Sequence, residues 1–269
     1  MSNRTQHVGL ISAARREIFE AALKSPLWMM LGWNDIRQRY RRSVLGPFWI
    51  TISMAVFISV LGLIYSKIFS IEIKTYLPFL TAGYVIWGFI SQTINESSGA
   101  FQEGDRIIKQ IRLPYGLYVF RVVWRNIIIF AHTIVIFVPV ALVFNVRPGA
   151  MIILAVPGFI LLCLNLIWIS AALAVIATRY RDIVQVVATA VQIALFATPI
   201  MWPISTLGES TWIANINPLY HFIDLVRGPL IGQLPALHSW AISTAIACIG
   251  SLIAVVLLRR ASQRLVFWL

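Results

Sequence analysis

The sequence DIRQRYRRSVLGPFWITISMAVFISVLGLIYS, residues 35–66, joins a strongly basic segment to a long apolar one. Residues 35–42 contain four arginines, whereas residues 48–66 contain no Asp, Glu, Lys or Arg. An apolar run of about 20 residues is long enough for a helix to cross a bilayer. Basic residues beside such a helix usually stay on the cytoplasmic side. The stretch therefore predicts a membrane-spanning helix with a basic flank.

The composition of the whole chain indicates a membrane protein. Of the 269 residues, 59% are hydrophobic and only 12% are charged, and the mean hydropathy is +0.82. Soluble domains carry about 25% charged residues, so this chain has too few polar groups to cover a water-exposed surface. The two cysteines, Cys163 and Cys248, both lie in apolar runs, and we expect no metal or redox site from them.

Charge-free stretches divide the chain into expected spans. Two of them are longer than one span needs, and we expect those spans to begin near Met151 and near His238 or Trp240. The alternating pattern of membrane β-strands is absent. We expect an all-α integral membrane protein, with an N-terminal segment over residues 1–47 and six transmembrane helices within residues 48–269. The six charge-free stretches are 48–66, 75–95, 126–146, 148–178, 183–208 and 228–258.

The basic residues fix an expected orientation. With six spans, all but four of the 22 lysines and arginines fall on one side of the membrane. The side rich in lysine and arginine is usually cytoplasmic, so we expect both termini in the cytoplasm. The net charge of +12 is spread along this face, which favours membrane lipids and excludes nucleic acid as the partner. The four exceptions are Lys67, Lys74, Arg147 and Arg227.

The segment before the first span has a helical pattern. Trp33, Ile36 and Tyr40 fall on one face of a helix, and Asp35, Arg39 and Arg42 fall on another. This pattern predicts an amphipathic helix in the membrane interface, with its apolar side toward lipid and its basic side toward headgroups or a partner. A basic flank that only sets topology explains the arginines equally well, but not the regular apolar face.

The loop between the second and third spans predicts a short helix over residues 104–113, ended by Pro114. An exposed helix of mixed charge with an apolar edge is able to dock into a partner's groove. A plain connecting helix would show the same pattern. The charged residues of this loop helix and its start are Glu103, Asp105, Arg106 and Lys109.

The region between the fifth and sixth spans is apolar although it lies outside them. Prolines at 203, 218, 229 and 235 divide it into short pieces. Short apolar helices of this kind are expected to pack back into the membrane as re-entrant or gate-like elements, although a structural surface cap is the alternative. Asp224 and Arg227 are three residues apart, which predicts a local ion pair.

The chain lacks the motifs of a nucleotide-binding or hydrolytic site. It contains no G-x-x-x-x-G-K-[ST], no H-E-x-x-H and no G-x-S-x-G. Ion-coupled transporters usually place a relay of ionisable groups in the membrane, but the spans contain almost none besides Glu96 and His132. If the protein transports a substrate, we therefore expect a separate ATPase to supply the energy.

Two segments resemble ABC-2-type permeases, as found in bacterial polysaccharide exporters. They are DIRQRYRRSVLGPFW, residues 35–49, and NPLYHFIDLVRGPLIG, residues 217–232, and the overall likeness covers nearly the whole chain. The resemblance implies a homodimer in the bacterial inner membrane with two separate nucleotide-binding subunits. Those subunits would bind ATP and Mg²⁺, so this chain would carry no cofactor and would not itself be an enzyme.

The resemblance also implies a substrate and site residues. The substrate would be a polysaccharide on a polyprenyl-pyrophosphate carrier, such as O-antigen, capsule or teichoic acid. The 104–113 helix, with Glu103, Asp105, Arg106 and Lys109, would couple to the ATPase. Residues of the second segment would form the signature and gate, namely Asn217, Pro218, Asp224 and Arg227.

Simple chemistry adds two further sets of candidates. Arginines are suited to attract the pyrophosphate of the carrier at the cytoplasmic entrance. Aromatic rings are suited to hold a sliding glycan, although interfacial or lipid-facing positions would also favour them. The entrance arginines are Arg37, Arg39, Arg41 and Arg42, and the expected channel-lining aromatic residues are Tyr65, Tyr84, Trp87, Phe196 and Trp202.

Two other functions remain open. One is an ABC-2 permease for a drug or a smaller lipid. The other is a membrane-embedded lipid-sugar transferase, which would need a catalytic carboxylate facing water. Glu96, Glu103 and Asp105 are the nearest candidates, and their positions in the sequence form no persuasive catalytic arrangement.

Overall fold

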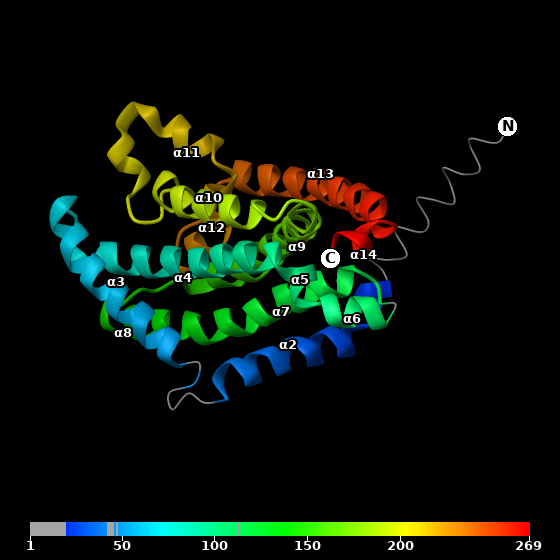
Figure 1. Ribbon diagram of the computed structural model, residues 1–269. Coiled ribbons are helices and arrows are strands. Elements are labelled where there is room, and N and C mark those ends of the chain that lie inside the picture. Colours follow the sequence, from blue (N-terminus) through cyan, green and yellow to red (C-terminus); the bar gives the residue numbers. More distant parts are fainter. Residues whose placement is uncertain (1–19, 42–45, 47, 112) are drawn as a thin grey trace.

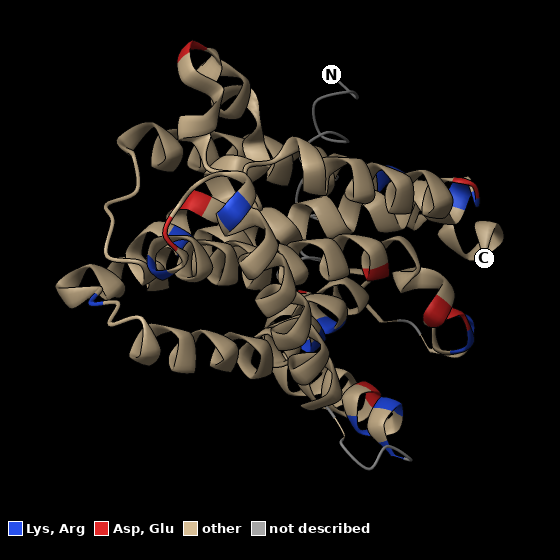
Figure 2. Ribbon diagram, turned by 90° about the vertical axis from the view of Figure 1, so that its left-hand side faces the viewer, with Lys and Arg blue, Asp and Glu red and all other residues tan. Residues whose placement is uncertain are grey.

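The computed structural model describes residues 20–41, 46, 48–111 and 113–269 (Figure 1). Within these residues all regular secondary structure is helical, and there are no strands. Most of the length of the long helices carries no charged residue (Figure 2). Five helical segments are long and apolar enough to cross a bilayer, namely α3 (Phe48–Ile68), α4 (Ile73–Ser98), Gly116–Val143, Gly149–Arg179 and α13 (Leu237–Ser262).

Shorter helices complete the described fold. The segment Gly116–Val143 passes through a 3-10 turn one turn before Pro139, because a proline removes a helical hydrogen bond and crowds the preceding turn. The remaining elements are α2 (Ser25–Tyr40), α5 (Ala100–Glu103), α6 (Asp105–Gln110), α7 (Gly116–Thr133), η1 (Ile134–Ile136), α8 (Phe137–Val143), η2 (Gly149–Leu154), α9 (Ala155–Arg179), α10 (Ile183–Ala197), η3 (Ile204–Thr211), α11 (Trp212–Ile216), α12 (Pro218–Leu230) and α14 (Leu265–Trp268).

The prediction of six full-length spans is corrected at the fifth. The charge-free stretch 183–208 contains α10, which has 15 residues and ends at Ala197. Such a helix is about 22 Å long, against a hydrocarbon core of about 30 Å. It ends there because Thr198 precedes Pro199 and adopts an extended conformation, as residues before proline prefer. The described part of the chain therefore has five long apolar helices and one shorter apolar helix.

The core lies where α4, α9 and α12 meet. Ile86 of α4, Leu162 of α9 and Phe222 of α12 are at most 1% exposed and belong to one buried apolar cluster. At Gly158 of α9 a side chain would lie 2.3 Å from the carbonyl oxygen of Leu225, so only glycine allows the two backbones to approach this closely. Helix α12 is thus packed among the long helices instead of lying over their ends.

Helix α3 is the least buried of the five long segments. Only 11% of its apolar window is buried, compared with 61% for α4. Large apolar side chains, including Phe57 and Leu63, are exposed along it. A face of this kind must be covered by lipid or by another protein chain.

Candidate functional site

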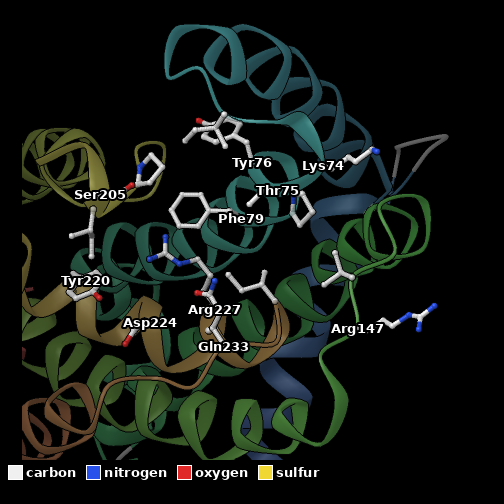
Figure 3. A pocket seen from close by; sticks show the side chains of 17 residues that line it. Lys74, Thr75, Tyr76, Phe79, Arg147, Ser205, Tyr220, Asp224, Arg227 and Gln233 are labelled. Atoms are coloured by element: carbon white, nitrogen blue, oxygen red, sulfur yellow. The ribbon is translucent and has the colours of Figure 1, made fainter. Parts of the chain in front are cut away.

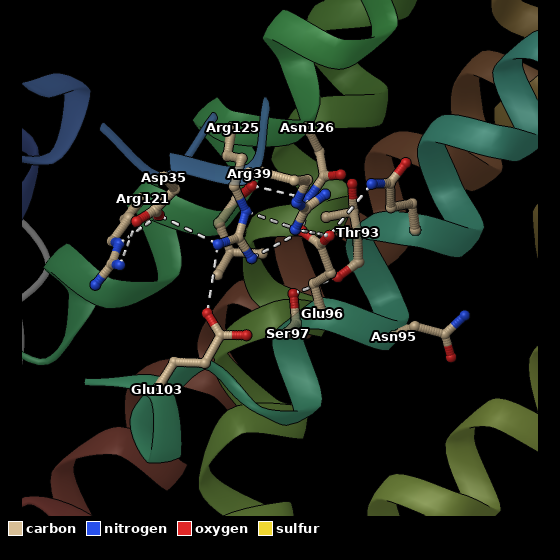
Figure 4. A network of polar contacts seen from close by, with 12 residues as sticks. Asp35, Arg39, Thr93, Asn95, Glu96, Ser97, Glu103, Arg121, Arg125 and Asn126 are labelled. Atoms are coloured by element: carbon tan, nitrogen blue, oxygen red, sulfur yellow. Dashed lines mark hydrogen bonds and ion pairs between the residues drawn. The ribbon is translucent and has the colours of Figure 1, made fainter. Parts of the chain in front are cut away.

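A network of ion pairs joins α2, α4, α5 and α7 (Figure 4). Arg121 Nε of α7 donates to Asp35 Oδ2 of α2 at 2.7 Å. Arg125, one turn later, donates through Nη1 to Asp35 Oδ2 at 3.1 Å and to Glu103 Oε2 at 3.3 Å. Its Nε donates to Glu96 Oε2 of α4 at 3.0 Å. Arg125 is only 3% exposed, so three carboxylates compensate one buried charge.

Glu96 collects further donors from two other helices. Arg39 Nη2 of α2 donates to Glu96 Oε1 at 2.9 Å, and Asn126 Nδ2 of α7 donates to Oε2 at 2.8 Å. The network thus contains three carboxylates and three guanidinium groups and is neutral overall. Burial raises the pKa of the neighbouring Tyr40 phenol above its ordinary value. Removing one partner from a buried ion pair costs about 3–5 kcal/mol, so this network fixes α2 against the bundle.

Helix α2 packs against α7 with its polar side as well as its apolar one. Trp28 stacks on Phe120 at a ring-centroid distance of 5.7 Å, and at Gly32 a side chain would lie 3.2 Å from the carbonyl oxygen of Arg121. We expected Asp35 and Arg39 to face headgroups or a partner, but they face α7 and α4. The difference follows from Arg125, whose buried charge requires carboxylates nearby.

The entrance arginines do not act as one set. Arg37, Arg39 and Arg41 are all exposed, and among them Arg39 is paired with Glu96. Arg42 lies outside the residues that the structure describes.

The expected coupling helix is shorter than predicted. Helix α6 covers Asp105–Gln110 because Ile111 adopts an extended conformation. Glu103 turns inward to Arg125, whereas Arg106 and Lys109 are exposed. Asp105 pairs with Lys109 at 2.8 Å. The element therefore presents charged side chains outward while one of its carboxylates reaches the buried network.

The five aromatic candidates do not line one surface of the chain. Trp87 is 4% exposed and lies in the core, and Phe196 is 62% exposed. Trp202 Nε1 donates to the carbonyl oxygen of Phe196 at 3.0 Å, so these two residues are neighbours. Tyr65 and Tyr84 are half-buried, pack against one apolar cluster and contact different aromatic rings.

Asn217 and Pro218 begin α12 in a way that the sequence favours. The Asn217 Oδ1 atom accepts a hydrogen bond from the Leu219 backbone nitrogen at 2.9 Å, which is a standard N-cap, and Pro218 occupies the first helical position. The Asn217 Nδ2 atom donates to Thr198 Oγ1 at 2.9 Å. Asn217 thus ties the start of α12 to the break after α10, a role that the sequence alone did not reveal.

The expected ion pair between Asp224 and Arg227 is not formed. Asp224 Oδ2 accepts a hydrogen bond from Ser239 Oγ of α13 at 2.8 Å. Arg227 Nη1 donates to the carbonyl oxygen of Pro199 at 2.7 Å, and its guanidinium lies 4.3 Å from the centre of the Phe79 ring. The Asp224 carboxylate therefore contacts α13. The Arg227 guanidinium contacts α4 and the segment directly after α10.

A cavity of about 640 Å³ opens beside Arg227 (Figure 3). Phe79 of α4 and Tyr220 of α12 line it together with Arg227, and Lys74 and Arg147 lie at its rim. Sequence analysis did not predict this cavity. The usable signal in the sequence was a single arginine, Arg227, within an otherwise apolar segment.

The roles of Arg121 and Arg125 were also missed, because the sequence analysis only counted them among the basic residues on the expected cytoplasmic side. Their spacing of four residues places both on one face of α7, where they meet Asp35. Two arginines on one helical face next to an apolar run were a sign of buried carboxylate partners.

Comparison with known proteins assigns the family. Residues 26–231 match the family described as ABC-2 type transporter. The chain is similar to the O-antigen export system permease protein RfbA of Klebsiella pneumoniae, with 23% identity over 195 residues, which are 71% of this chain and 74% of that protein. It is 22% identical to the protein of the same description from Myxococcus xanthus over 197 residues, 72% of this chain and 75% of that one.

ABC-2 permeases are membrane subunits that pair with ATPase subunits. The prediction that this chain is a transporter component and not an enzyme is therefore confirmed by the family match. The matched region contains α4, α7, α9, α10 and α12, and thus the ion-pair network and all the residues that line the cavity except Gln233. The chain is a multi-pass integral membrane protein and belongs to the ABC-2 type transporter family.

Proposed function

We propose that this chain is the channel-forming subunit of an ABC exporter for a lipid-linked cell-surface polysaccharide of the O-antigen kind. The observation that carries the substrate class is the similarity to two O-antigen export permeases over more than two thirds of the chain. The polymer is loaded from the cytoplasm on a polyprenyl-pyrophosphate carrier and moves outward as ATP is hydrolysed on a partner subunit. ATP and Mg²⁺ bind to that partner.

Two copies of the chain and two ATPase subunits form the working complex in this proposal. The sparsely buried apolar face of α3 supports a second copy, because a channel must be closed on both sides. Helices α5 and α6 dock into the ATPase through exposed Arg106, Lys109 and Ile111. Glu103 then passes a movement of this element to Arg125 and so to α2, α4 and α7.

The end of the bundle with α5 and α6 faces the cytoplasm in this arrangement, as do both termini. The predominance of basic residues at that end supports the orientation. Arg37 and Arg41, which are exposed, and Arg42 attract the carrier pyrophosphate, while Arg39 serves mainly to hold Glu96. At the opposite end, α12 acts as a re-entrant gate whose position depends on Asn217 and Pro218.

A permease for a drug or a smaller lipid is the second candidate. The cavity of about 640 Å³ supports it, since small-molecule sites usually have volumes of about 300–1,000 Å³. The two candidates differ in the substrate but share the fold and the energy source.

Reconstitution with the cognate ATPase in proteoliposomes separates these candidates. We expect a polyprenyl-pyrophosphate-linked glycan to stimulate ATP hydrolysis and to appear on the opposite side of the membrane. The carrier without its glycan serves as the control. Stimulation by small amphipathic drugs alone, with no movement of the glycan, would contradict the polysaccharide proposal.

A further inference from the structure

We propose that the cavity beside Arg227 binds an oxyanion, the carboxylate or phosphate of an acidic sugar unit in the exported molecule. The inference rests on the proposed function, because the export substrate supplies the sugar. It goes further in naming a charged substituent of the substrate and the side chain that recognises it.

Arg227 has no counter-ion among the described residues. The residue is 4% exposed, and its side chain makes one hydrogen bond within the described part of the chain, from Nη1 to the Pro199 carbonyl oxygen. No carboxylate oxygen of a described residue lies within ion-pair distance of it. A guanidinium has five N–H donors and is always charged, so a buried one with a single neutral acceptor leaves donors available to a ligand.

Asp224 accepts hydrogen bonds from groups other than Arg227. Its Oδ2 atom accepts hydrogen bonds from Ser239 Oγ at 2.8 Å and from the Ala236 backbone nitrogen at 3.4 Å. These bonds hold the carboxylate toward the start of α13 and away from the guanidinium. The nearest acidic side chain on the same helix therefore fixes α12 to α13 and does not neutralise Arg227 by contact.

The cavity has a volume and a lining that suit a sugar. Its volume of about 640 Å³ accommodates a sugar unit with its substituents. Phe79 and Tyr220 provide aromatic surface in the lining. Aromatic rings contact the C–H face of a sugar, while the guanidinium is suited to a carboxylate or phosphate.

The rim of the cavity adds positive charge. Lys74 and Arg147 are exposed there, and the Arg147 Nε atom also donates to Asn145 Oδ1 at 3.1 Å. Three cationic residues therefore border the cavity, against the single carboxylate of Asp224. Such a charge distribution attracts anions and makes their binding weaker at high salt.

The position of Arg227 links binding of an anion to the packing of three helices. Its guanidinium connects α12 to α4 through Phe79 and to the break after α10 through Pro199. An oxyanion bound by the remaining N–H donors would share the guanidinium with the Pro199 carbonyl oxygen. Binding of an acidic sugar would thus act on the contacts that join α12 to α4 and to the end of α10.

The test is equilibrium binding to the full-length chain in nanodiscs of zwitterionic lipid. The probes are glucuronate and glucose 6-phosphate, with uncharged glucose as the control. We expect both charged sugars to bind, to bind more weakly as salt increases, and to bind at least about tenfold more tightly than glucose, because hydrogen bonds to charged groups are strong.

Variants identify the group responsible. Arg227→Gln should abolish binding of the charged sugars, and Arg227→Lys should retain part of it. Arg260→Gln, which removes an exposed arginine of α13 outside the cavity lining, is the matched control and should bind as the unaltered protein does. Unchanged binding in a folded Arg227→Gln protein would overturn the proposal.

A second pair of variants keeps the test decisive even if Arg227→Gln does not fold. Thr75 is exposed and lines the cavity, so Thr75→Glu introduces a carboxylate into the cavity that Arg227 also lines. We expect it to prevent binding of charged sugars without loss of thermal stability, whereas Thr75→Gln should leave binding within about threefold. Equal binding by both variants would overturn the proposal.

Anionic lipid is the alternative source of the oxyanion. A second set of nanodiscs that contain phosphatidylglycerol tests this source. If phosphatidylglycerol binds at Arg227 there and neither sugar binds in the zwitterionic nanodiscs, the assignment to the exported molecule is wrong. The assay uses no ATP and no transport, so failure to bind leaves the export proposal standing. Failure of ATP-driven export in proteoliposomes would likewise leave a measured anion site in place.

Discussion

Arg125 and Arg227 are both buried arginines, 3% and 4% exposed, and they lie at opposite ends of the bundle. Helix α4 runs between them, with Glu96 beside Arg125 and Phe79 beside Arg227, about 26 Å apart along the helix. Arg125 contacts three carboxylates, whereas Arg227 contacts one carbonyl oxygen and one aromatic ring. Both sites bury a charge, but only one of them neutralises it internally.

The difference indicates that the two ends of the bundle have different functions. The neutral network fixes α2, α4, α5 and α7 to one another, which suits an end that must transmit force from a partner. The other end leaves a cation facing a cavity, which suits recognition of an anionic ligand. Buried charges that are compensated within the protein serve structure or coupling, and those that are not point to a binding site.

The largest effect is expected from Arg125→Gln. Asp35, Glu96 and Glu103 lose their shared partner, and breaking a buried ion pair costs about 3–5 kcal/mol. Thermal unfolding of the detergent-purified protein, followed by loss of the monodisperse species, measures the change. The exposed Arg106→Gln is the control. A loss below about 1 kcal/mol would show that the network does not hold the end of the bundle.

A smaller effect is expected from Asn217→Ala. The substitution removes the N-cap of α12, which is worth about 1 kcal/mol, and the hydrogen bond to Thr198. Unfolding measurements should show a loss of about 1–2 kcal/mol. Asn217→Asp keeps the cap but cannot donate to Thr198. The stability of this variant should therefore lie between those of Asn217→Ala and the unaltered protein. If Asn217→Ala and the unaltered protein unfold alike, neutral hydrogen bonds do not position α12.

Arg227→Gln should destabilise the protein by less than about 1 kcal/mol. It loses the bond to Pro199 and the contact with Phe79, but it also removes a buried charge without a counter-ion, so the two terms largely offset each other. The same unfolding assay measures this loss of stability and compares it with the loss in Arg125→Gln. Equal losses for the two variants would remove the contrast between the two ends.

The smallest effect on stability is expected from Glu103→Gln. Its side chain is 47% exposed and lies 3.3 Å from Arg125, and exposed pairs contribute about 0–1 kcal/mol. In the reconstituted complex, however, we expect export per ATP hydrolysed to fall several-fold, because α5 then loses its link to the network. Unchanged coupling would place the transmission of force elsewhere.

Much of the fold was predictable from the positions of charged residues. Long apolar runs between them located five long helices, and α13 begins at Leu237, next to the expected His238. The fifth span was predicted too long because a lack of charge was taken for continuous helix. The sequence Thr198–Pro199 carries the signal for the break, since a residue before proline disfavours the helical conformation.

The site was less predictable because its contacts join distant parts of the chain. Asp35 and Arg125 are 90 positions apart, and Arg227 and Pro199 are 28 apart. Helical spacing places a residue on a face but does not say which helix covers that face. For this reason Asp224 and Arg227 were expected to pair with each other, while each has a different partner in the fold.

Thermal unfolding with and without glucuronate tests the contrast between the two arginines most directly. A ligand at about ten times its dissociation constant stabilises by about 1.4 kcal/mol, so glucuronate should raise the unfolding midpoint of the unaltered protein by a few degrees. We predict the same rise for the much less stable Arg125→Gln protein and none for Arg227→Gln. A rise that persists in Arg227→Gln, or that is absent from the unaltered protein, would contradict this account.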